Sequence, residues 1–218
     1  MQSKLIIIRG NSGSGKTTTA KRLQEYLGQG TLLISQDVVR RDMLMVKDRE
    51  GNLSIDLIRQ IAEYGKDKCK FVIVEGILNK TRYGEMLNSL IQFYDRKVYT
   101  YYFDLSFEET VKRHNSRSKK FKFGEESLRA WWSPNEYLDV DGEVKLTDEM
   151  SQNHIFELIL NQIKKWKYWE NINTEILYRS QWHLKWPPNK REYYFLRRIH
   201  FEEAFNRITL YISNTGYN

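Results

Sequence analysis

The chain has 218 residues, the length of one ordinary domain with room for a short extension. Hydrophobic residues make up 40% and charged residues 29%, values typical of a soluble globular protein, which argues against a disordered or membrane-embedded chain. The net charge of +7 favours anionic ligands such as nucleotides or a nucleic acid. The single cysteine, Cys69, excludes an internal disulfide and favours a cytoplasmic location.

The first expected element is a short buried strand at residues 5–8, where every side chain is apolar. This run ends at Arg9 and is too short for a signal peptide or a membrane span. A helix is expected further on, because Ala20, Leu23 and Leu27 recur at helical spacing. Between strand and helix the chain fits the pattern G-x-x-x-x-G-K-S/T, with the residues Gly10, Asn11, Ser12, Gly13, Ser14, Gly15, Lys16 and Thr17.

This loop predicts a site for the phosphates of a nucleoside triphosphate, which we expect to be ATP. Glycines let backbone N–H groups surround phosphate oxygens, and the start of a helix adds positive potential. We expect residues 10–18, ending at Thr18, to bind ATP, with Lys16 at the β- and γ-phosphates. The hydroxyl of Thr17 is a candidate ligand of Mg²⁺. A chance glycine-rich turn explains the loop but not the strand and helix around it.

Apolar runs and helical patterns alternate as far as about residue 166. Ser106 and Glu109 have the spacing of a capping box at the start of one helix. The alternation predicts an α/β fold of the P-loop NTPase type, a five-stranded parallel sheet flanked by helices, nucleoside-kinase-like in size. Further strands are expected at 31–35, 71–75, 98–104 and 144–146, and helices near 37, 57–62, 86–94, 107–114 and 155–166.

Asp37 comes just after the expected second strand, and Arg40 follows it at helical spacing. Ligands of open α/β sheets bind at the carboxyl ends of the strands, so both residues are candidates for the site. The carboxylate could accept a proton from an acceptor hydroxyl, and the arginine could hold the acceptor or its phosphate. The alternative is that Asp37 only caps a helix and Arg40 is solvated.

Glu75 ends the third apolar strand and precedes Gly76. A carboxylate at this position beside the phosphate loop can reach Mg²⁺ through a water molecule, or contact the acceptor. The alternative interpretation is a polar residue that merely terminates the strand.

Arg113 and Arg117 share one face of the helix that follows the fourth strand, with lysines around them. Arginines suit bidentate contact with phosphate, so this segment, at about 112–129, is a candidate lid over the nucleotide. A solvated basic helix end would show the same pattern, since the helix dipole favours cations there.

Four stretches together resemble the P-loop kinases related to phage-type polynucleotide kinase and the zeta toxins. They are the phosphate loop, the D-x-x-R of 37–40, the strand 71–75 and the segment 103–117, within about residues 1–130. The chain is also similar to bacterial proteins that are often labelled uridine kinases. The resemblance implies that Asp37 is the general base, that Arg40 aids catalysis, and that Arg113 and Arg117 are lid arginines.

Two features depart from this family. Glu75 ends the third strand where polynucleotide kinase has an aspartate region, so we expect different contacts to the acceptor. The chain after residue 166 does not resemble the phosphatase half of the bifunctional repair enzymes.

The extension, residues 167–218, is basic and rich in aromatic residues, and is expected to be mostly helical. It is a candidate small cap or homo-oligomer contact, in preference to a single-stranded nucleic-acid surface. The pair Trp131 and Trp132 could stack on a base of the acceptor, but packing is the favoured interpretation.

Two hypotheses about function follow. The first is an ATP- and Mg²⁺-dependent kinase with residues 1–166 as its catalytic domain, acting on a hydroxyl of a nucleoside-like small molecule or the 5′-hydroxyl of a polynucleotide. The second is a protein that hydrolyses or senses ATP without a phosphoryl acceptor. The sequence predicts no membrane partner and does not identify the acceptor.

Overall fold

The structure is a computed structural model that describes residues 3–115 and 124–164. Two compact units divide the chain, Met1–Gln162 and Ile163–Asn218, and every labelled helix and strand lies in the first. The extension expected at 167–218 lies outside the described residues, and the domain boundary near residue 166 stays a prediction. Across the described ranges, no helix combines the length and apolar character needed to cross a membrane.

A five-stranded parallel sheet forms the centre of the first unit, as predicted. Its order is β2-β3-β1-β4-β5, so the first strand lies in the middle. Every residue of β1 and β3 is buried, which is why both read as continuous apolar runs. The strands are β1 (Lys4–Gly10), β2 (Thr31–Ser35), β3 (Phe71–Gly76), β4 (Val98–Phe103) and β5 (Val144–Leu146).

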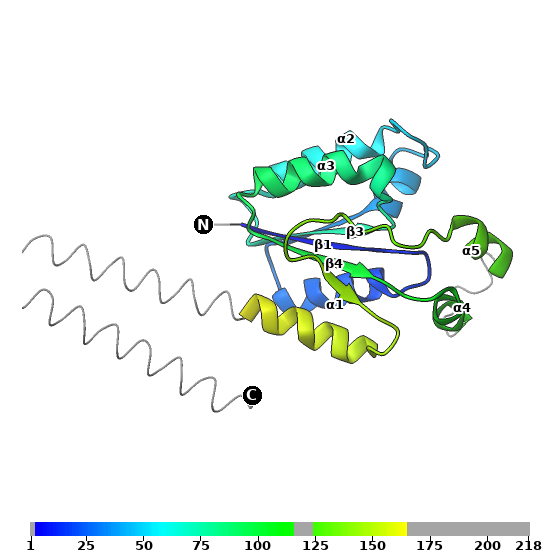
Figure 1. Cartoon of the computed structure of the whole chain (residues 1–218). Helices are drawn as coiled ribbons and strands as arrows, with labels where there is room; N and C mark the ends of the chain where they lie inside the picture. Colours follow the sequence, from blue (N-terminus) through cyan, green and yellow to red (C-terminus); the bar gives the residue numbers. More distant parts are fainter. Residues whose placement is uncertain (1–2, 116–123, 165–218) are drawn as a thin grey trace, which may run out of the picture. The chain divides into compact units, whose positions relative to one another are not determined.

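Helices cover both faces of this sheet (Figure 1). On one face α2 and α3 pack together, and their apolar side chains meet those of β1, β2 and β3 in the main core. On the other face α1 lies beside a helix over 152–164, where the ring of Tyr26 contacts that of Phe156 at 6.0 Å between centroids. The labelled helices are α1 (Lys16–Leu27), η1 (Val38–Met43), α2 (Ser54–Gly65), α3 (Lys80–Phe93), α4 (Phe107–Asn115) and α5 (Glu125–Trp131).

Arg9 does not end the first strand but lies inside it, fully buried. Its guanidinium donates to the carbonyl oxygen of Leu78 at 2.9 and 3.1 Å and to that of Glu136 at 2.8 Å. An ion pair with Glu143 at 3.3 Å balances the charge. Burial lowers the pKa of Arg9, and Glu143 opposes this shift. This arginine thus joins the central strand to two loops at the carboxyl end of the sheet.

The helix expected near Asp37 is a single wide turn, the π-helix η1. Such turns are rare, and they often occur at functional sites. The capping box at α4 is half formed: the backbone N–H of Glu109 donates to the Ser106 hydroxyl at 3.2 Å. The backbone N–H of Ser106 donates to Asp148 instead, at 3.0 Å, so the Glu109 carboxylate is left for other contacts.

Candidate functional site

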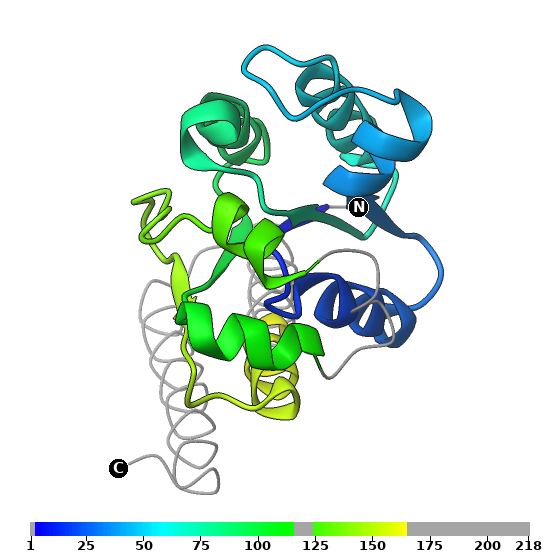
Figure 2. The same ribbon diagram turned by 90° about the vertical axis from the view of Figure 1, so that its right-hand side faces the viewer.

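The phosphate loop connects β1 to α1 at the carboxyl end of the sheet. Gly10 begins it with φ of 140°, and a Cβ here would lie 2.7 Å from the Cβ of Phe103 on β4. Gly15 caps α1 in the left-handed region, with φ of 113°. Both positions therefore require glycine, which explains the two glycines that the motif specifies. Figure 2 looks onto this end of the molecule, with α4 and α5 in front.

Lys16 is buried, and its ammonium donates to the carbonyl oxygen of Asn11 across the loop at 2.9 Å. The side chain therefore spans the loop and holds it in shape. It also lines the pocket described below. A phosphate bound in the loop would meet this ammonium without a large movement of the backbone.

Thr17 and Glu75 lie in direct contact, as expected of two residues at one metal site. The Thr17 hydroxyl donates to one Glu75 carboxylate oxygen at 3.0 Å, and the Ser35 hydroxyl donates to the other at 2.5 Å. Glu75 is 2% exposed. These oxygen donors suit Mg²⁺, which also takes ligands from nucleotide phosphates. Within the described ranges, no cluster of three or more His, Cys, Asp or Glu side chains forms a metal cage.

A pocket of about 470 Å³ opens beside the loop. Six of the predicted site residues line it: Ser12, Lys16, Thr17, Asp37, Arg40 and Glu75. They come from the phosphate loop, from the start of α1, from the turn after β2 and from the end of β3. The carboxyl ends of neighbouring parallel strands bring these residues together, as the sequence predicts.

Asp37 makes no side-chain cap to η1. One of its oxygens, Oδ1, accepts a hydrogen bond from Arg40 at 2.9 Å and forms an ion pair with Arg41 at 3.1 Å. Its side chain is 62% exposed, while that of Arg40 is 12% exposed and also donates to the carbonyl oxygen of Val46 at 3.3 Å. The two arginines thus fix the orientation of the carboxylate, and the interpretation of Asp37 as a side-chain helix cap is not supported.

Arg113 lies against the outer side of the phosphate loop and is not among the residues lining the pocket. Its guanidinium donates to the carbonyl oxygens of Ser14 and Met150, each at 3.1 Å, and to the Glu109 carboxylate at 2.7 Å. These contacts tie α4 to the loop. The role of Arg113 in phosphate contact stays a prediction, and Arg117 lies outside the described residues.

Several residues of the site were not expected from the sequence: Ser35, Asp48, Arg82 and Ser133. Ser133 exchanges two hydrogen bonds, at 2.8 and 2.9 Å, with the expected Asn11, and these join the phosphate loop to the segment after α5. Asp48 accepts from Tyr83 at 2.8 Å and pairs with Arg82 at 3.3 Å. Only Ser35 carried a usable signal, a polar residue at the end of an apolar strand. The others follow strands or helices at distances that no motif fixes.

The tryptophan pair divides between two environments. Trp132 packs edge-on against Phe107, with 5.9 Å between ring centroids, as the packing interpretation predicts. Trp131 is 44% exposed and lines the pocket. Its position is compatible with contact to an acceptor, the less favoured of the two interpretations of this pair.

The central β1 strand, the glycine-bearing loop before α1 and the Thr17–Glu75 contact define the P-loop class of α/β proteins. Residues 5–133 match the AAA_33 family, described as an AAA domain, and the chain belongs to this family. No curated protein matches the sequence.

Several solved kinases have similar structures. A gluconokinase from Sinorhizobium meliloti 1021 is 14% identical, with a TM-score of 0.56 over 78% of this chain and 98% of its own. The Mycobacterium tuberculosis APS kinase, in complex with AMPPNP and APS, is 14% identical, with a TM-score of 0.56 over 75% and 98%. A sugar kinase from Janibacter sp. HTCC2649 is 17% identical, with a TM-score of 0.51 over 74% and 95%. These likenesses show the fold, which by itself does not specify a reaction.

Proposed function

We propose that this protein is an ATP-dependent kinase that transfers the γ-phosphoryl group to a hydroxyl of a small molecule. One observation carries the proposal: the Asp37 carboxylate, oriented by two arginines, lines the same pocket as Lys16 and Thr17. A protein that only binds or hydrolyses ATP has no need of an oriented carboxylate facing the γ-phosphate side of its nucleotide pocket. The related folds of a gluconokinase, an APS kinase and a sugar kinase support the same class of reaction.

In the proposed step, the acceptor oxygen forms a bond to the γ-phosphorus while the bond from that phosphorus to the β,γ-bridging oxygen breaks. ADP leaves with the bridging oxygen, and the hydroxyl proton passes to the Asp37 carboxylate. Lys16 and the loop N–H groups hold the β- and γ-phosphates, and Arg40 positions the acceptor. Thr17 would bind Mg²⁺ directly and Glu75 through water, and the ion would neutralise charge on the phosphates.

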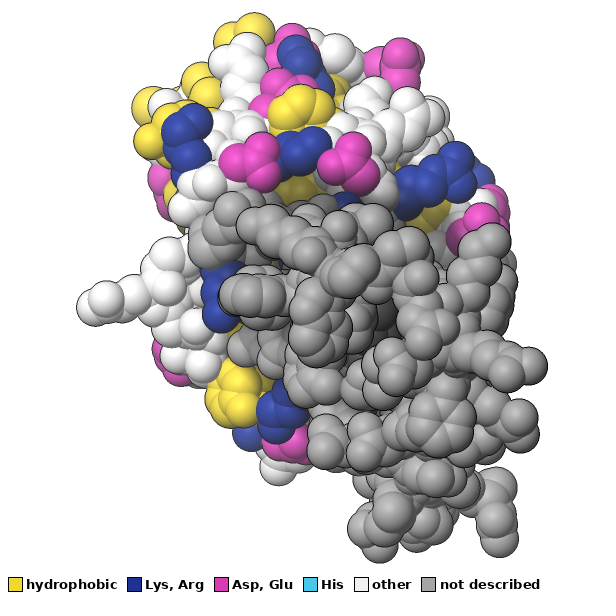
Figure 3. Space-filling model, turned by 90° about the vertical axis from the view of Figure 1, so that its left-hand side faces the viewer, with side chains coloured by type: hydrophobic (Ala, Val, Ile, Leu, Met, Phe, Trp, Pro, Cys, Tyr) yellow, Lys and Arg dark blue, Asp and Glu magenta, His cyan; other side chains and the backbone are white. Residues whose placement is uncertain are grey.

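The size of the pocket favours a small acceptor. The cavity of about 470 Å³ takes in the phosphate side as well as the acceptor side, so the room left beside the phosphates suits a small molecule. A polynucleotide would place only its terminal nucleotide there and would need a basic surface leading to it. On the side of the molecule opposite the pocket, basic and acidic side chains are interspersed over the described surface (Figure 3).

The proposal is tested with γ-labelled ATP, Mg²⁺ and separate pools of nucleosides, sugars, the monophosphates of both, antibiotics and 5′-hydroxyl oligonucleotides. We expect label to appear in an organic product from a small-molecule pool. Label in the oligonucleotide pool alone would show that the acceptor is a polynucleotide and not a small molecule. Label found only in inorganic phosphate, in every pool, would contradict the kinase and favour the ATPase alternative.

A further inference from the structure

The wall of the pocket away from the phosphate loop carries an excess of positive charge. Four cationic residues line it: Arg40, Arg41, Lys47 and Arg82. The carboxylates on this wall are Asp37 and Asp48, whereas Lys16 and Glu75 belong to the nucleotide and metal side. Cations gathered in a cleft attract an anion, because the surrounding protein screens their charge less than bulk water does.

Both carboxylates are already engaged by arginines. Asp37 accepts a hydrogen bond from Arg40 and forms an ion pair with Arg41, and Asp48 accepts from Arg82 and from the Tyr83 hydroxyl. Lys47 is exposed at the pocket and makes no ion pair within the part of the chain that the structure describes. The surplus charge on this wall is therefore not neutralised by the protein itself.

Arg40 and Arg82 also keep unused hydrogen-bond donors. The Nε atom of each is buried and has no hydrogen-bond partner among the described residues. Within residues 3–115 and 124–164, the guanidinium of Arg82 makes one hydrogen bond, a long one of 3.3 Å from Nη2 to Asp48. A phosphate group would offer this guanidinium two oxygens in place of one weak contact, and buried donors without partners are costly.

We propose that Arg82, Lys47 and Arg40 form a phosphate subsite, and that the acceptor is an alcohol which already carries a phosphate group. The inference rests on the proposed kinase function and names its substrate class. The wall has two more cations than carboxylates, which matches the charge of −1.5 to −2 typical of a phosphate monoester at about pH 7 better than the single charge of a carboxylate. Asp48 would hold Arg82 in place until the acceptor binds.

Binding of inorganic phosphate tests the subsite without any reaction. The full-length protein is saturated with AMPPNP and Mg²⁺, so that the phosphate loop is filled, and phosphate is titrated at constant ionic strength by calorimetry. We expect saturable binding, with a Kd raised about tenfold or more in Arg82→Gln and in Lys47→Gln. Thermal melting of each variant checks that it is folded.

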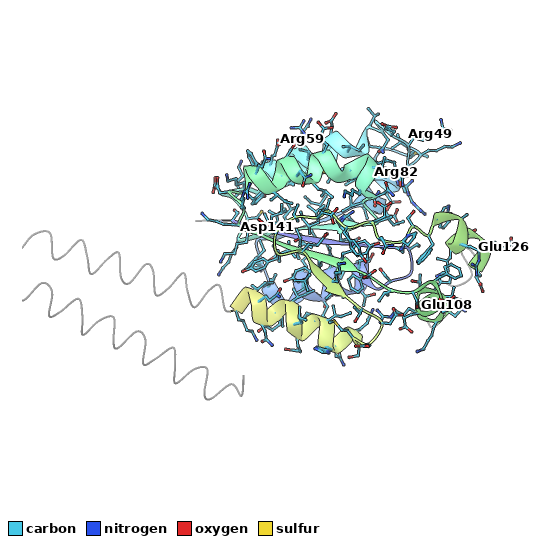
Figure 4. The ribbon with its side chains drawn as sticks, viewed as in Figure 1. Arg49, Arg59, Arg82, Glu108, Glu126 and Asp141 are labelled. Atoms are coloured by element: carbon cyan, nitrogen blue, oxygen red, sulfur yellow. The ribbon has the colours of Figure 1, made fainter. Side chains whose placement is uncertain are left out.

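Arg49→Gln is the matched control, because Arg49 lies in the same loop as Lys47 but does not line the pocket. Figure 4 labels Arg49 and Arg82 and shows the first in the loop before α2 and the second at the start of α3. We expect the control to bind phosphate like the wild type. Absence of saturable binding in the wild type, or equal binding in all three variants, would overturn the subsite.

A second experiment separates the substrate class from the kinase function. Acceptors are offered in matched pairs, such as a hexose with its 6-phosphate and a nucleoside with its 3′-monophosphate, and label transfer from γ-labelled ATP is followed. We expect kcat/KM to be at least about tenfold higher for the phosphate-bearing member of a productive pair. Equal values would overturn the substrate class and leave the kinase intact. Transfer to no member of any pair would overturn the kinase, while the phosphate titration would still decide the subsite.

Discussion

Asp37 has a carboxylate with one oxygen committed and the other available. Oδ1 accepts a hydrogen bond from Arg40 and forms an ion pair with Arg41, whereas Oδ2 has no partner among the described residues. This geometry suits a base that must be oriented before it receives a proton. The same arginines would stay close enough to meet charge that develops on the acceptor.

Replacement of Asp37 by asparagine keeps the shape of the side chain and removes its basicity. We expect Asp37→Asn to lower kcat for phosphoryl transfer about 10²- to 10⁴-fold, with the affinity for AMPPNP nearly unchanged. Steady-state kinetics and calorimetry measure the two quantities. Asp141→Asn is a suitable control, because Asp141 is exposed and lies away from the pocket (Figure 4). Full turnover by Asp37→Asn would show that Asp37 is not the general base.

Glu75 holds the hydroxyls of Thr17 and Ser35 with its two oxygens. If it orients the Mg²⁺ site through water, Glu75→Gln should raise the Mg²⁺ concentration needed for AMPPNP binding about 10- to 100-fold. A Mg²⁺ titration at fixed AMPPNP measures this change, with the exposed Glu126→Gln as control. An unchanged requirement would reduce Glu75 to a buried residue that only ends the strand.

The residues found from the sequence are those whose position is fixed by a motif or a strand end. The loop, Asp37 and Glu75 fall in this class, because each is tied to the carboxyl end of a parallel strand. Arg82 and Asp48 could not be found in this way, since their meeting depends on how α3 and the loop before α2 pack.

At the scale of elements, α4 is fastened to the phosphate loop through Arg113. Glu109 orients this arginine, and the hydrogen bond from Arg113, followed by that from Lys112, lowers the pKa of Glu109 below its ordinary value of 4.5. A carboxylate whose pKa is lower in the folded state stabilises that state at pH values above the pKa it has in the unfolded chain. That contribution is lost as the pH falls through the folded value.

Glu109→Gln should therefore reduce the free energy of unfolding at neutral pH and matter less in acid. We expect a loss of about 0.5 to 1 kcal/mol at about pH 7, limited by solvent screening, and almost none at about pH 3. Urea unfolding at both values measures the difference. The neighbouring Glu108→Gln is the control, since Glu108 is exposed on the same helix (Figure 4). An equal loss at both values would contradict the linkage to Arg113.

Element positions were largely predictable because buried strands and amphipathic helices leave periodic patterns. The turn after β2 was expected as a helix start, and it forms one π-helical turn that no periodicity indicates. Arg9 was expected to end the strand, because the sequence alone does not show whether an arginine side chain is buried or exposed. Only tertiary contacts with Leu78, Glu136 and Glu143 reveal its place.

For the whole molecule, the parallel sheet and its helical layers agree with the prediction from alternating strands and helices. The order of the strands was not predicted, because pairing depends on contacts between distant segments. The pocket wall proposed to bind the acceptor combines residues of η1, of the loop before α2 and of the start of α3. No single motif joins these segments, which is why the sequence indicates phosphoryl transfer more clearly than its acceptor.

The most direct test of the kinase is the ratio of inorganic phosphate to ADP formed by the whole protein. With ATP, Mg²⁺ and a mixture of phosphate-bearing alcohols, transfer to a hydroxyl yields ADP without an equal amount of inorganic phosphate. We predict a ratio far below one, rising toward one when the acceptors are left out and only slow hydrolysis remains. A ratio of one with every acceptor mixture would contradict the account and identify an ATPase.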